Sequence, residues 1–505
     1  MNFANHVDGA ARDAPEKTAL SDPERSVTFE QFATETSRFA NAIAELGVAA
    51  GDRVAIYLPN GIPFVTAYFG AMKRGAIPLP VNMRFGGQEI EYVLEDAGAS
   101  AVVTSGRFED MLDDVEVVAL DHRIVVDGES GHDYDDLLAS ADDERTVYPR
   151  KEAELADLMY TSGTTGRPKG VKHTHRNLST NARGLVKYVE WSEHEIGLTV
   201  CPCFHVSGLH ITVTPFVLAG ATNHLLPSWD PATTLETIAD REVSYVFCIP
   251  TMVIDLLNFD GHKEYDTSSL GVIGVGGAPM PKERIEATEA AFDCELLEGY
   301  GMTETTPLAA INLPGPDVTR KPGSVGQPTR EVVDLRVENP ETGREVAREE
   351  KGEVLWHGDT VTPGYFNDPE RNEAAFVERE GKRWLCSGDI GRLDAEGHLF
   401  IEDRVDDMII TGGENVYPRE VEDVLYGIDG VREAAVIDTP DDRLGQSVTA
   451  IVVPADGSLS ADRIEGTVRE HLADYKIPRR IEFVDELPKT STRKTDKVAL
   501  RERFH

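Results

Sequence analysis

Helix-like and strand-like segments alternate along most of the chain, and this alternation limits the folds that it can adopt. Residues 27–46 and 62–75 place apolar side chains at helical spacing, whereas residues 51–59 and 76–82 have the character of buried strands. The same rhythm continues at residues 99–105, 244–250 and 270–277. Because connecting helices cover the faces of parallel sheets, the sequence predicts an α/β fold with mostly parallel sheets.

The pattern changes after about residue 320, where short strand-like segments with turn residues replace the alternation. These segments are residues 321–328, 334–346 and 352–358. They predict a small antiparallel β-barrel. Residues 399–428 then pass from strand to loop to helix, and a compact α+β region follows. We therefore expect a large domain of residues 1–403, a tight hinge at 404–406 and a small domain of residues 407–505.

Acidic residues far outnumber basic ones: 89 Asp and Glu accompany 50 Lys and Arg, and the formal net charge is −39. A surface of this sign repels nucleic acid and anionic membranes, because both are bound through clustered cations. Hydrophobic residues still make up 40% of the chain, so the acidity does not indicate disorder. We expect a folded protein from the salty cytoplasm of a halophilic archaeon, with an ordinary acidic mesophile protein as the alternative.

The sequence shows no signal for export or for membrane insertion. The N-terminal stretch MNFANHVDGAARDAPEK has no basic segment and no apolar core, so it does not resemble a signal peptide. The best apolar run, residues 246–257, is too short to cross a bilayer and contains Pro250 and Asp255. Five cysteines in 505 residues do not form a disulfide framework. The sequence predicts a cytoplasmic protein without a transmembrane segment.

A glycine-rich stretch, YTSGTTGRPKGV at residues 160–171, contains no acidic residue although the chain around it is strongly acidic. Glycines let the backbone approach a ligand, hydroxyl groups can donate to phosphate oxygens, and lysine supplies a positive charge. The stretch is not a Walker A loop, because Gly170 follows Lys169 where that motif needs Ser or Thr. Taken alone, it is either a polyphosphate-binding loop or a plain turn. The candidate phosphate-binding residues are Thr161, Ser162, Gly163, Thr164, Thr165, Gly166 and Lys169.

This stretch closely resembles the signature of the adenylate-forming (AMP-binding) superfamily, which includes acyl-CoA synthetases, carrier-protein adenylation domains and luciferases. Further motifs of the family follow in order: CFHVSGLH (203–210), GGAPM (276–280), EGYGMTETTP (298–307), CSGDIG (386–391), IEDRVDDMIITGGENVYPREVE (401–422) and LPKTSTRKTDK (487–497). The resemblance spans nearly the whole chain. It implies a large domain of two doubly wound, mostly parallel sheets plus a small β-barrel, followed by a mobile α+β domain.

The resemblance also implies a two-step reaction. A carboxylate attacks the α-phosphate of ATP to give acyl-AMP and pyrophosphate, and a thiol then displaces AMP. We therefore expect an AMP-forming acid–thiol ligase, an acyl-CoA synthetase, that uses ATP, Mg²⁺ and CoA. In this family Tyr300, Gly277 and Ala278 would form the adenine slot, while Asp389 would accept both ribose hydroxyls with help from Arg404.

By the same resemblance, the TETT segment and a C-terminal lysine would carry the catalysis. Glu304 would ligate Mg²⁺, a hard cation that prefers carboxylate oxygen, and Thr303 would contact the α-phosphate. Lys494 matches the lysine that bridges the acid and the phosphate during adenylation. Lys489 and Lys497 are the competing candidates for that role.

Several positions near the domain boundary match the family's pattern for domain movement. Asp406 matches the hinge residue, although the neighbouring Asp407 competes for that assignment. Gly412 and Gly413 would face the site after rotation of the small domain and let the pantetheine arm of CoA pass close to the backbone. The residue before the adenylation lysine is usually glycine in the family and is Arg493 here, with an effect that is left open.

The acid substrate is the least defined part of the prediction. His205 lies in HVSGL, which resembles the acyl-pocket segment of the family, and would line or gate the pocket. His173 and His175 are expected to be solvated or to cap a helix. The pocket segments are small and apolar, and no Asp–Lys pair for an α-amino acid is evident.

We therefore expect CoA and a carboxylic acid as substrates, with a medium- or long-chain fatty acid first and an aryl or carboxy-aryl acid as the alternative. A non-catalytic AMP or acyl-AMP sensor is an alternative from a different class. The sequence does not determine the oligomeric state, for which a homodimer is one candidate.

Overall fold

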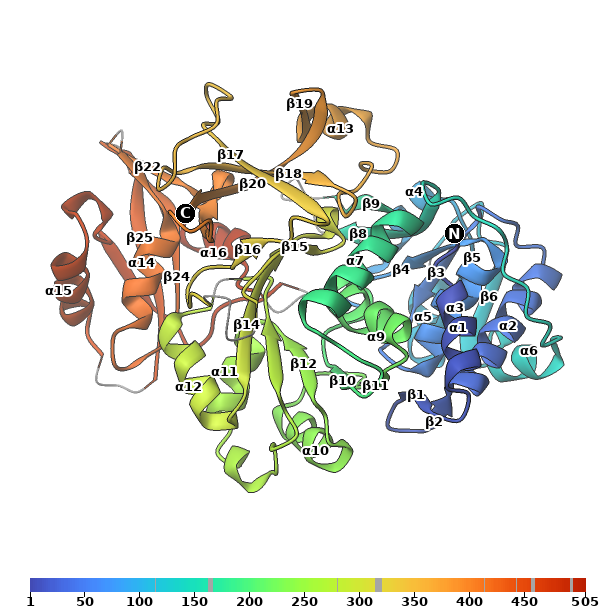
Figure 1. Ribbon diagram of the computed structural model, residues 1–505. Helices are drawn as coiled ribbons and strands as arrows, with labels where there is room; N and C mark the ends of the chain where they lie inside the picture. Colours follow the sequence, from blue (N-terminus) through green and yellow to red (C-terminus); the bar gives the residue numbers. More distant parts are fainter. Residues whose placement is uncertain are drawn as a thin grey trace.

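The computed structural model describes residues 1–113, 115–161, 167–278, 280–313, 320–412, 414–441, 443–455, 459–490 and 494–505, and gives only the backbone for residues 406 and 415. Two sheets with parallel strands make up most of the large domain, and Figure 1 shows them in blue and in green to yellow. Among the helices that the described residues form, none is both long and apolar enough to span a bilayer.

The first sheet is parallel throughout and has the strand order β4–β3–β5–β6–β7. Its strands are β3 (Arg53–Tyr57), β4 (Ile77–Pro80), β5 (Ala99–Ser105), β6 (His122–Val126) and β7 (His132–Asp133). The helices of this region are α1 (Asn5–Asp13), α2 (Phe29–Glu45), α3 (Ile62–Arg74), α4 (Gly87–Ala97), α5 (Glu109–Asp113) and α6 (Tyr134–Ser140). The helix α2 begins where Thr28 and Gln31 form a capping box, and its apolar face is buried in the core.

The second sheet is mixed and has the order β16–β15–β14–β13–β12–β10–β11–β1–β2. Its inner pairs, from β14 to β1, are parallel, while β2, β15 and β16 pair antiparallel at the two edges. The strands are β1 (Thr18–Ser21), β2 (Ser26–Thr28), β10 (Ile196–Thr199), β11 (Thr222–Leu225), β12 (Tyr245–Cys248), β13 (Val272–Val275), β14 (Glu295–Gly301), β15 (Leu308–Ile311) and β16 (Gln327–Pro328). The helices are α7 (His175–Tyr188), α8 (Val206–Gly208), α9 (Thr214–Ala219), α10 (Pro231–Arg241), α11 (Pro250–Asn258) and α12 (Lys282–Phe292).

A hairpin of β8 (Leu155–Thr161) and β9 (Lys169–Thr174) carries the glycine-rich stretch between its two strands. The residues after the loop return as strand β9. The helix α7 then begins at His175, because Thr174 caps it together with Asn177.

The short strands predicted after residue 320 form an antiparallel sheet of order β17–β18–β20–β19, with β21 paired to β20. They are β17 (Val333–Glu338), β18 (Gly352–Gly358), β19 (Phe376–Arg379), β20 (Lys382–Leu393) and β21 (Leu399–Arg404), with helix α13 (Pro369–Ala375) before β19.

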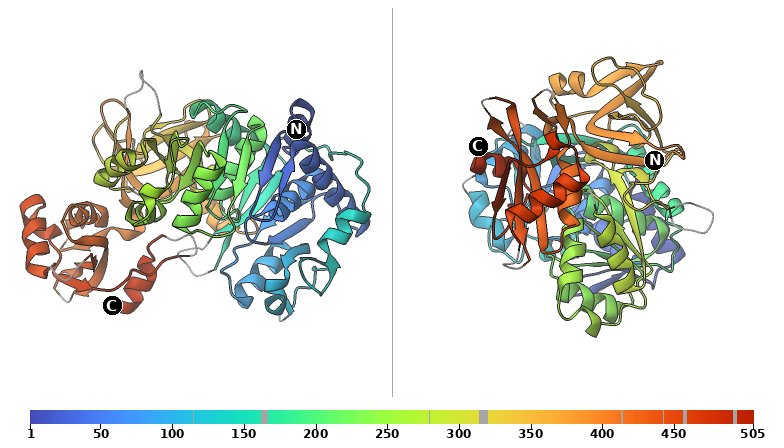
Figure 2. Two further views of the ribbon diagram at one scale, coloured as in Figure 1. Left: turned by 90° about the horizontal axis from the view of Figure 1, so that it is seen from below. Right: turned by 90° about the vertical axis from the view of Figure 1, so that its left-hand side faces the viewer.

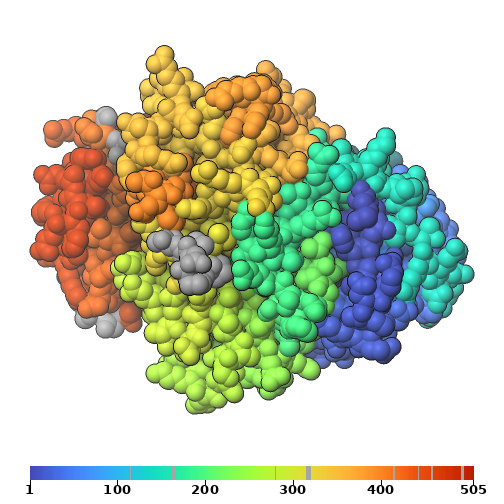
Figure 3. All heavy atoms as spheres, in the orientation of Figure 1, coloured from blue at the N-terminus to red at the C-terminus, as the bar shows by residue number. Residues whose placement is uncertain are grey.

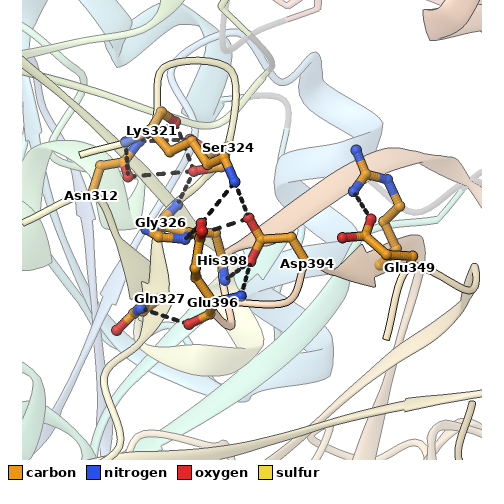
Figure 4. A network of polar contacts seen from close by, with 10 residues as sticks. Asn312, Lys321, Ser324, Gly326, Gln327, Glu349, Asp394, Glu396 and His398 are labelled. Atoms are coloured by element: carbon orange, nitrogen blue, oxygen red, sulfur yellow. Dashed lines mark hydrogen bonds and ion pairs between the residues drawn. The ribbon is translucent and has the colours of Figure 1, made fainter. Parts of the chain in front are cut away.

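The turn between β20 and β21 is tied to the segment that precedes β16 (Figure 4). The ammonium group of Lys321 lies 2.5 Å from Asp394 and 2.9 Å from Glu396. Asp394 also accepts the backbone N–H of His398 at 2.8 Å. These acids and His398 are grouped as metal ligands would be, but the lysine ammonium already supplies the positive charge between them.

The C-terminal unit begins after a 3₁₀ turn at Val405–Asp407, and Figure 2 (left) shows it as a separate lobe in red. Its sheet contains β22 (Ile409–Thr411), β23 (Glu414–Val416), β24 (Val431–Asp441), β25 (Gly445–Pro454) and β26 (Arg480–Phe483), covered by α14 (Pro418–Tyr426), α15 (Ala461–His471) and α16 (Lys497–Phe504). In the space-filling view this lobe packs against the middle of the molecule, while the N-terminal sheet forms the opposite end (Figure 3). The structure confirms the predicted α/β class with parallel sheets and a separate C-terminal domain.

Candidate functional site

The ends of the β8–β9 hairpin bring the two described flanks of the glycine-rich loop together. Thr161, the last residue of β8, lies opposite Lys169, the first residue of β9. Within the described part of the chain, the buried hydroxyl of Thr161 has no hydrogen-bond partner. A buried hydroxyl of this kind is suited to a ligand that supplies an acceptor, such as a phosphate oxygen. The other predicted loop residues, Ser162, Gly163, Thr164, Thr165 and Gly166, lie outside the described residues.

Lys169 and Glu304 form a half-buried ion pair that Tyr365 completes. The Lys169 ammonium lies 2.7 Å from the Glu304 carboxylate, and the Tyr365 hydroxyl donates to the same oxygen at 2.9 Å. Burial opposes ionisation of Glu304, but the Lys169 charge and these hydrogen bonds outweigh it and lower the pKa of the carboxyl group. Glu304 is therefore an ionised oxygen ligand in a buried place, which fits Mg²⁺ as the predicted metal.

Thr303 and Glu304 open a tight turn whose backbone is strained. The turn, a 3₁₀ segment at Thr303–Thr305, ends at Thr306 with φ +63°. That left-handed conformation is unfavourable for a β-branched residue and costs about 1–3 kcal/mol. The Thr306 hydroxyl donates to the Thr360 carbonyl at 2.7 Å, and the Thr362 N–H donates to the Glu304 carbonyl at 2.8 Å. Surrounding groups thus hold the turn that presents the Glu304 carboxylate.

Tyr300, Asp389 and Arg404, all predicted to contact the nucleoside, form one hydrogen-bonded group. The Tyr300 hydroxyl donates to one oxygen of Asp389, and Arg404 donates to the other at 2.9 Å. Asp389 and Arg404 are cross-strand neighbours on β20 and β21, and the ring of Tyr300 stacks on Trp356 at 5.6 Å between centroids. Each carboxylate oxygen has two acceptor sites, so Asp389 keeps capacity for two ribose hydroxyls.

Lys494 reaches from the C-terminal unit to the nucleotide side of the large domain. A Cβ built on Gly277, which has φ +82°, would lie 3.6 Å from the Lys494 ammonium nitrogen. Burial lowers the pKa of Lys494, while the charges of Asp389 and Glu304 act in the opposite direction. The loop that carries the lysine also contacts the large domain directly, since Arg84 donates to the Thr490 carbonyl at 3.2 Å.

Of two further residues singled out near the nucleotide site, the structure describes one. Ala278 is exposed next to Gly277, at the carboxyl end of β13. Arg493, the residue before Lys494, lies outside the described residues.

His205 caps the short helix α8 and lies within reach of the Lys494 charge. Its Nδ1 atom accepts the backbone N–H of Ser207 at 3.3 Å and lies 2.9 Å from the hydroxyl of that residue. Burial, with a further contribution from the Lys494 charge, lowers the pKa of His205 to about 3. The imidazole is therefore neutral at neutral pH, which suits a residue that lines an acyl pocket.

The predicted hinge and CoA-loop residues lie in the C-terminal unit. Gly412 occupies the turn between β22 and β23 with φ +60°, where an added Cβ would meet Leu444 at 3.2 Å. Its loop partner Gly413 lies outside the described residues. Asp406 lies in the 3₁₀ turn between β21 and β22, where the chain passes from one sheet to the other.

The prediction that His173 and His175 are solvated or capping residues is wrong. Both are buried, and the N-cap of α7 is Thr174. Sequence reasoning missed the return strand β9, so it did not see that Asp157 and His173 lie opposite each other. It also missed Tyr365, for which the only local signal was an aromatic residue after a glycine.

A buried carboxyl group in the middle of β14, Glu298, was likewise missed. Glu298 accepts the backbone N–H of Gly323 at 3.0 Å and the side-chain amide of Asn312 at 3.3 Å. Burial raises the pKa of Glu298 to about 7, although these hydrogen bonds and the charge of Arg419 act against it. A carboxyl group that titrates near neutral pH thus lies in the EGYG segment, two residues from Tyr300.

Comparison with known proteins identifies the family of the chain. The family profile described as AMP-binding enzyme matches residues 7–366, and the profile of the AMP-binding enzyme C-terminal domain matches residues 420–494. The chain is 36% identical to a feruloyl-CoA synthase of Amycolatopsis sp over 98% of this chain and 97% of that protein. It is 33% identical to the long-chain-fatty-acid–CoA ligase FadD13 of Mycobacterium tuberculosis over 97% of this chain and 96% of that protein.

Among solved structures, ATP-bound MatB of Rhodopseudomonas palustris matches with a TM-score of 0.92 at 31% identity and covers 100% of this chain and 99% of that chain. The apo form of the same protein matches with a lower TM-score of 0.82. The arrangement seen here is therefore closer to the ATP-bound form.

The raised pKa of Glu298 predicts how stability depends on pH. Between pH 4.5 and about 7 the folded state binds more protons than the unfolded state, so this group makes the protein less stable as pH rises, by about 3 kcal/mol in all. The variant Glu298→Gln keeps an acceptor oxygen but cannot ionise. We expect it to lose this pH dependence and to unfold at a higher temperature than the wild type at pH 8.

Thermal unfolding followed from pH 5 to pH 8 measures the difference. Glu236→Gln, at an exposed acid on α10, is the matched control and should follow the wild-type curve. Parallel curves for Glu298→Gln and the wild type would contradict the assignment.

Proposed function

We propose, from the premise that the chain belongs to the AMP-binding enzyme family, that the arrangement described above performs the adenylation half-reaction. The protein is an AMP-forming acid–CoA ligase that uses ATP, Mg²⁺ and CoA. The observation that carries the proposal is the position of Lys494, whose ammonium group lies against Gly277. A lysine of the small domain thus completes a site that the large domain builds.

Adenylation has to bring two anions into contact. An oxygen of the acid forms a bond to the α-phosphorus of ATP, the bond to the bridging oxygen breaks, and pyrophosphate leaves with that electron pair. Lys169 and Thr161, which face each other across the hairpin, would hold the leaving phosphates. Lys494, which lies against Gly277 and within reach of the charges of Asp389 and Glu304, would hold the two reacting anions. These cations offset the repulsion that opposes the attack.

Glu304 is the residue that would hold Mg²⁺. A metal ion bound there would neutralise the negative charge that develops on the leaving pyrophosphate. Lys169 pairs with the Glu304 carboxylate, so each charge of this buried pair compensates the other.

The second half-reaction would use a different face of the small domain. The thiolate of CoA attacks the acyl carbonyl, and AMP leaves with the oxygen that joined it to the acid. Lys494 would withdraw, and rotation about Asp406 would bring Gly412 and Gly413 to the site. The position of Gly412 beside Leu444, away from Gly277, supports a need for such a movement.

Replacing Lys494 separates the two half-reactions. In Lys494→Ala we expect acyl-AMP formation to fall by about a hundredfold or more, because the charge between the two anions is lost. Thioester formation from supplied acyl-AMP should stay within about threefold of the wild type. Pyrophosphate release and thioester production are measured in separate assays.

Lys489→Ala is the matched control, since Lys489 lies in the same loop but pairs with Glu433. It should affect neither half-reaction strongly. An equal loss of both half-reactions in Lys494→Ala would contradict the assigned role.

The acid substrate is proposed to be an apolar monocarboxylic acid, with a medium- or long-chain fatty acid first. The interior at the end of β13 is built of buried apolar side chains, among them Phe247, Ile249 and Met252. Phe247 and Tyr245 lie over Gly274 on the neighbouring strand, and Phe247 also adjoins Gly276. Aromatic rings beside glycines also suit an aryl acid, which is the second candidate.

A panel of fatty acids of increasing chain length and of cinnamate-type aryl acids decides between these candidates. With ATP, Mg²⁺ and CoA, the fatty-acid proposal expects the highest kcat/KM for a medium or long chain. The highest value for an aryl acid would favour the second candidate. Pyrophosphate release with none of the acids would contradict a ligase and favour a nucleotide sensor.

The same panel run at high and at low KCl tests the proposed halophilic origin. The net charge of −39 makes the folded state repel itself, and this repulsion grows as screening is removed. We expect activity and fold to be lost at low salt. Full activity at low salt would count against a halophilic source.

A further inference from the structure

A fully buried polar cluster lies behind the strained turn, and the reaction steps above do not use it. Its four members come from three segments: Asp157 and His173 from the β8–β9 hairpin, Tyr68 from α3 and His210 from the helical segment Leu209–Val213. Each of the four side chains is 0% exposed. Burying so many polar groups together is unfavourable unless their hydrogen bonds are satisfied, so their arrangement calls for a reason.

The hydrogen bonds of His173 define its protonation. Its Nδ1 atom lies 2.6 Å from Asp157, and its Nε2 atom lies 2.7 Å from the backbone carbonyl of Thr303. A carbonyl oxygen can only accept, and so can an ionised carboxylate. Both ring nitrogens of His173 must therefore donate, which makes the side chain an imidazolium.

The neighbours of Asp157 agree with this count. One carboxylate oxygen accepts from His173, and the other accepts from Tyr68 at 2.5 Å and from His210 at 2.8 Å. Burial opposes a charge on His173, but the Asp157 carboxylate and the two hydrogen bonds outweigh it and raise the pKa of the imidazole. Asp157 and His173 are therefore a buried ion pair without net charge.

The cluster is not arranged as a metal site, although its ligand atoms lie close together. Ligand atoms around a bound transition metal lie about 3 Å apart, because each is about 2 Å from the metal. The 2.6 Å between Asp157 and His173 is instead the length of a direct charge-assisted hydrogen bond.

Thr303 links the cluster to the metal-binding carboxylate. Its carbonyl accepts from His173 and also from the Thr306 N–H at 3.2 Å, the bond that closes the strained turn. The turn carries Glu304 as its next residue. Lys169 donates to the side chain of the turn, at Glu304, whereas His173 brings a charged donor to its backbone. Hydrogen bonds from a charged donor are about twice as strong as neutral ones.

We propose that His173 is a positioning residue for adenylation: braced by Asp157, it fixes the Thr303 carbonyl and thereby holds Glu304 in the orientation that Mg²⁺·ATP requires. His173 makes and breaks no bond in the reaction. The same strand, β9, supplies Lys169 to the Glu304 side chain and His173 to the backbone just before it. Both sit on one face of the strand, four residues apart.

The variant His173→Leu removes both donors while keeping a buried side chain of similar size. We expect the KM for Mg²⁺·ATP to rise and pyrophosphate release to fall by about tenfold or more, the effect of losing a hydrogen bond from a charged donor. Thioester formation at saturating supplied acyl-AMP should stay within about threefold of the wild type, because that step does not use the metal held by Glu304.

A second readout uses the nucleotide-free and metal-free enzyme. Backbone hydrogen exchange of the peptide that covers residues 301–307 should speed up by about tenfold in His173→Leu, since the turn has lost its charged donor. Tyr68→Phe is the matched control: it removes a hydrogen bond to the same carboxylate but touches neither Thr303 nor the turn. It should change neither the exchange of this peptide nor the ratio of the two half-reactions.

Asp157→Asn keeps the test decisive if His173→Leu does not fold. It leaves a neutral His173 that can still donate to Thr303, so we expect the same selective loss of adenylation at a smaller size, about threefold to tenfold. An equal loss of both half-reactions in either variant, or unchanged exchange of the turn in His173→Leu, would overturn the proposal.

Discussion

Repulsion between a carboxylate and a polyphosphate is the constraint around which this structure is organised. In a chain with a net charge of −39, the site has to gather positive charge from distant segments. Lys169 comes from the β8–β9 hairpin, Arg404 from the end of the antiparallel sheet, and Lys494 from the small domain. Glu304 and Asp389 lie beside Lys169 and Arg404, so the charges of these carboxylates are compensated.

The hairpin connects binding with geometry. Its loop is the sequence signature of the family, its strand β9 begins at Lys169, and the same strand delivers His173 to the backbone of the strained turn. One element thus faces both the side chain of Glu304 and the peptide group before it. A strand that fixes both groups would preorganise Glu304 for the proposed metal. Such preorganisation matters because a small displacement of a charged group strongly reduces its contribution to the reaction rate.

Sequence reasoning reached the fold class and the order of the nucleotide-binding motifs. The segments 27–46 and 62–75 became α2 and α3, and 51–59 and 99–105 became β3 and β5, because their periodicity reflects burial on one face or on both. The motifs placed Glu304, Asp389 and Lys494 in one region even though long stretches of chain separate them.

What the sequence could not provide was pairing between segments. His173 looked like one polar residue in an exposed lead to a helix, since KGVKHT has no apolar run that marks a strand. That Asp157 is its partner can be recognised only once the register of the hairpin is known. The contact of Tyr365 with Glu304 likewise depends on how distant segments of the chain pack together. These contacts depend on tertiary structure, which local propensity does not encode.

The central claim, that the site joins a carboxylate to the α-phosphate of ATP, is tested most directly by isotope transfer. The acid substrate is prepared with ¹⁸O in its carboxylate and turned over with ATP, Mg²⁺ and CoA, and the AMP product is examined by mass spectrometry. The account predicts that each AMP carries one oxygen from the acid, because AMP leaves with the oxygen that attacked phosphorus. Unlabelled AMP formed together with acyl-CoA would contradict it.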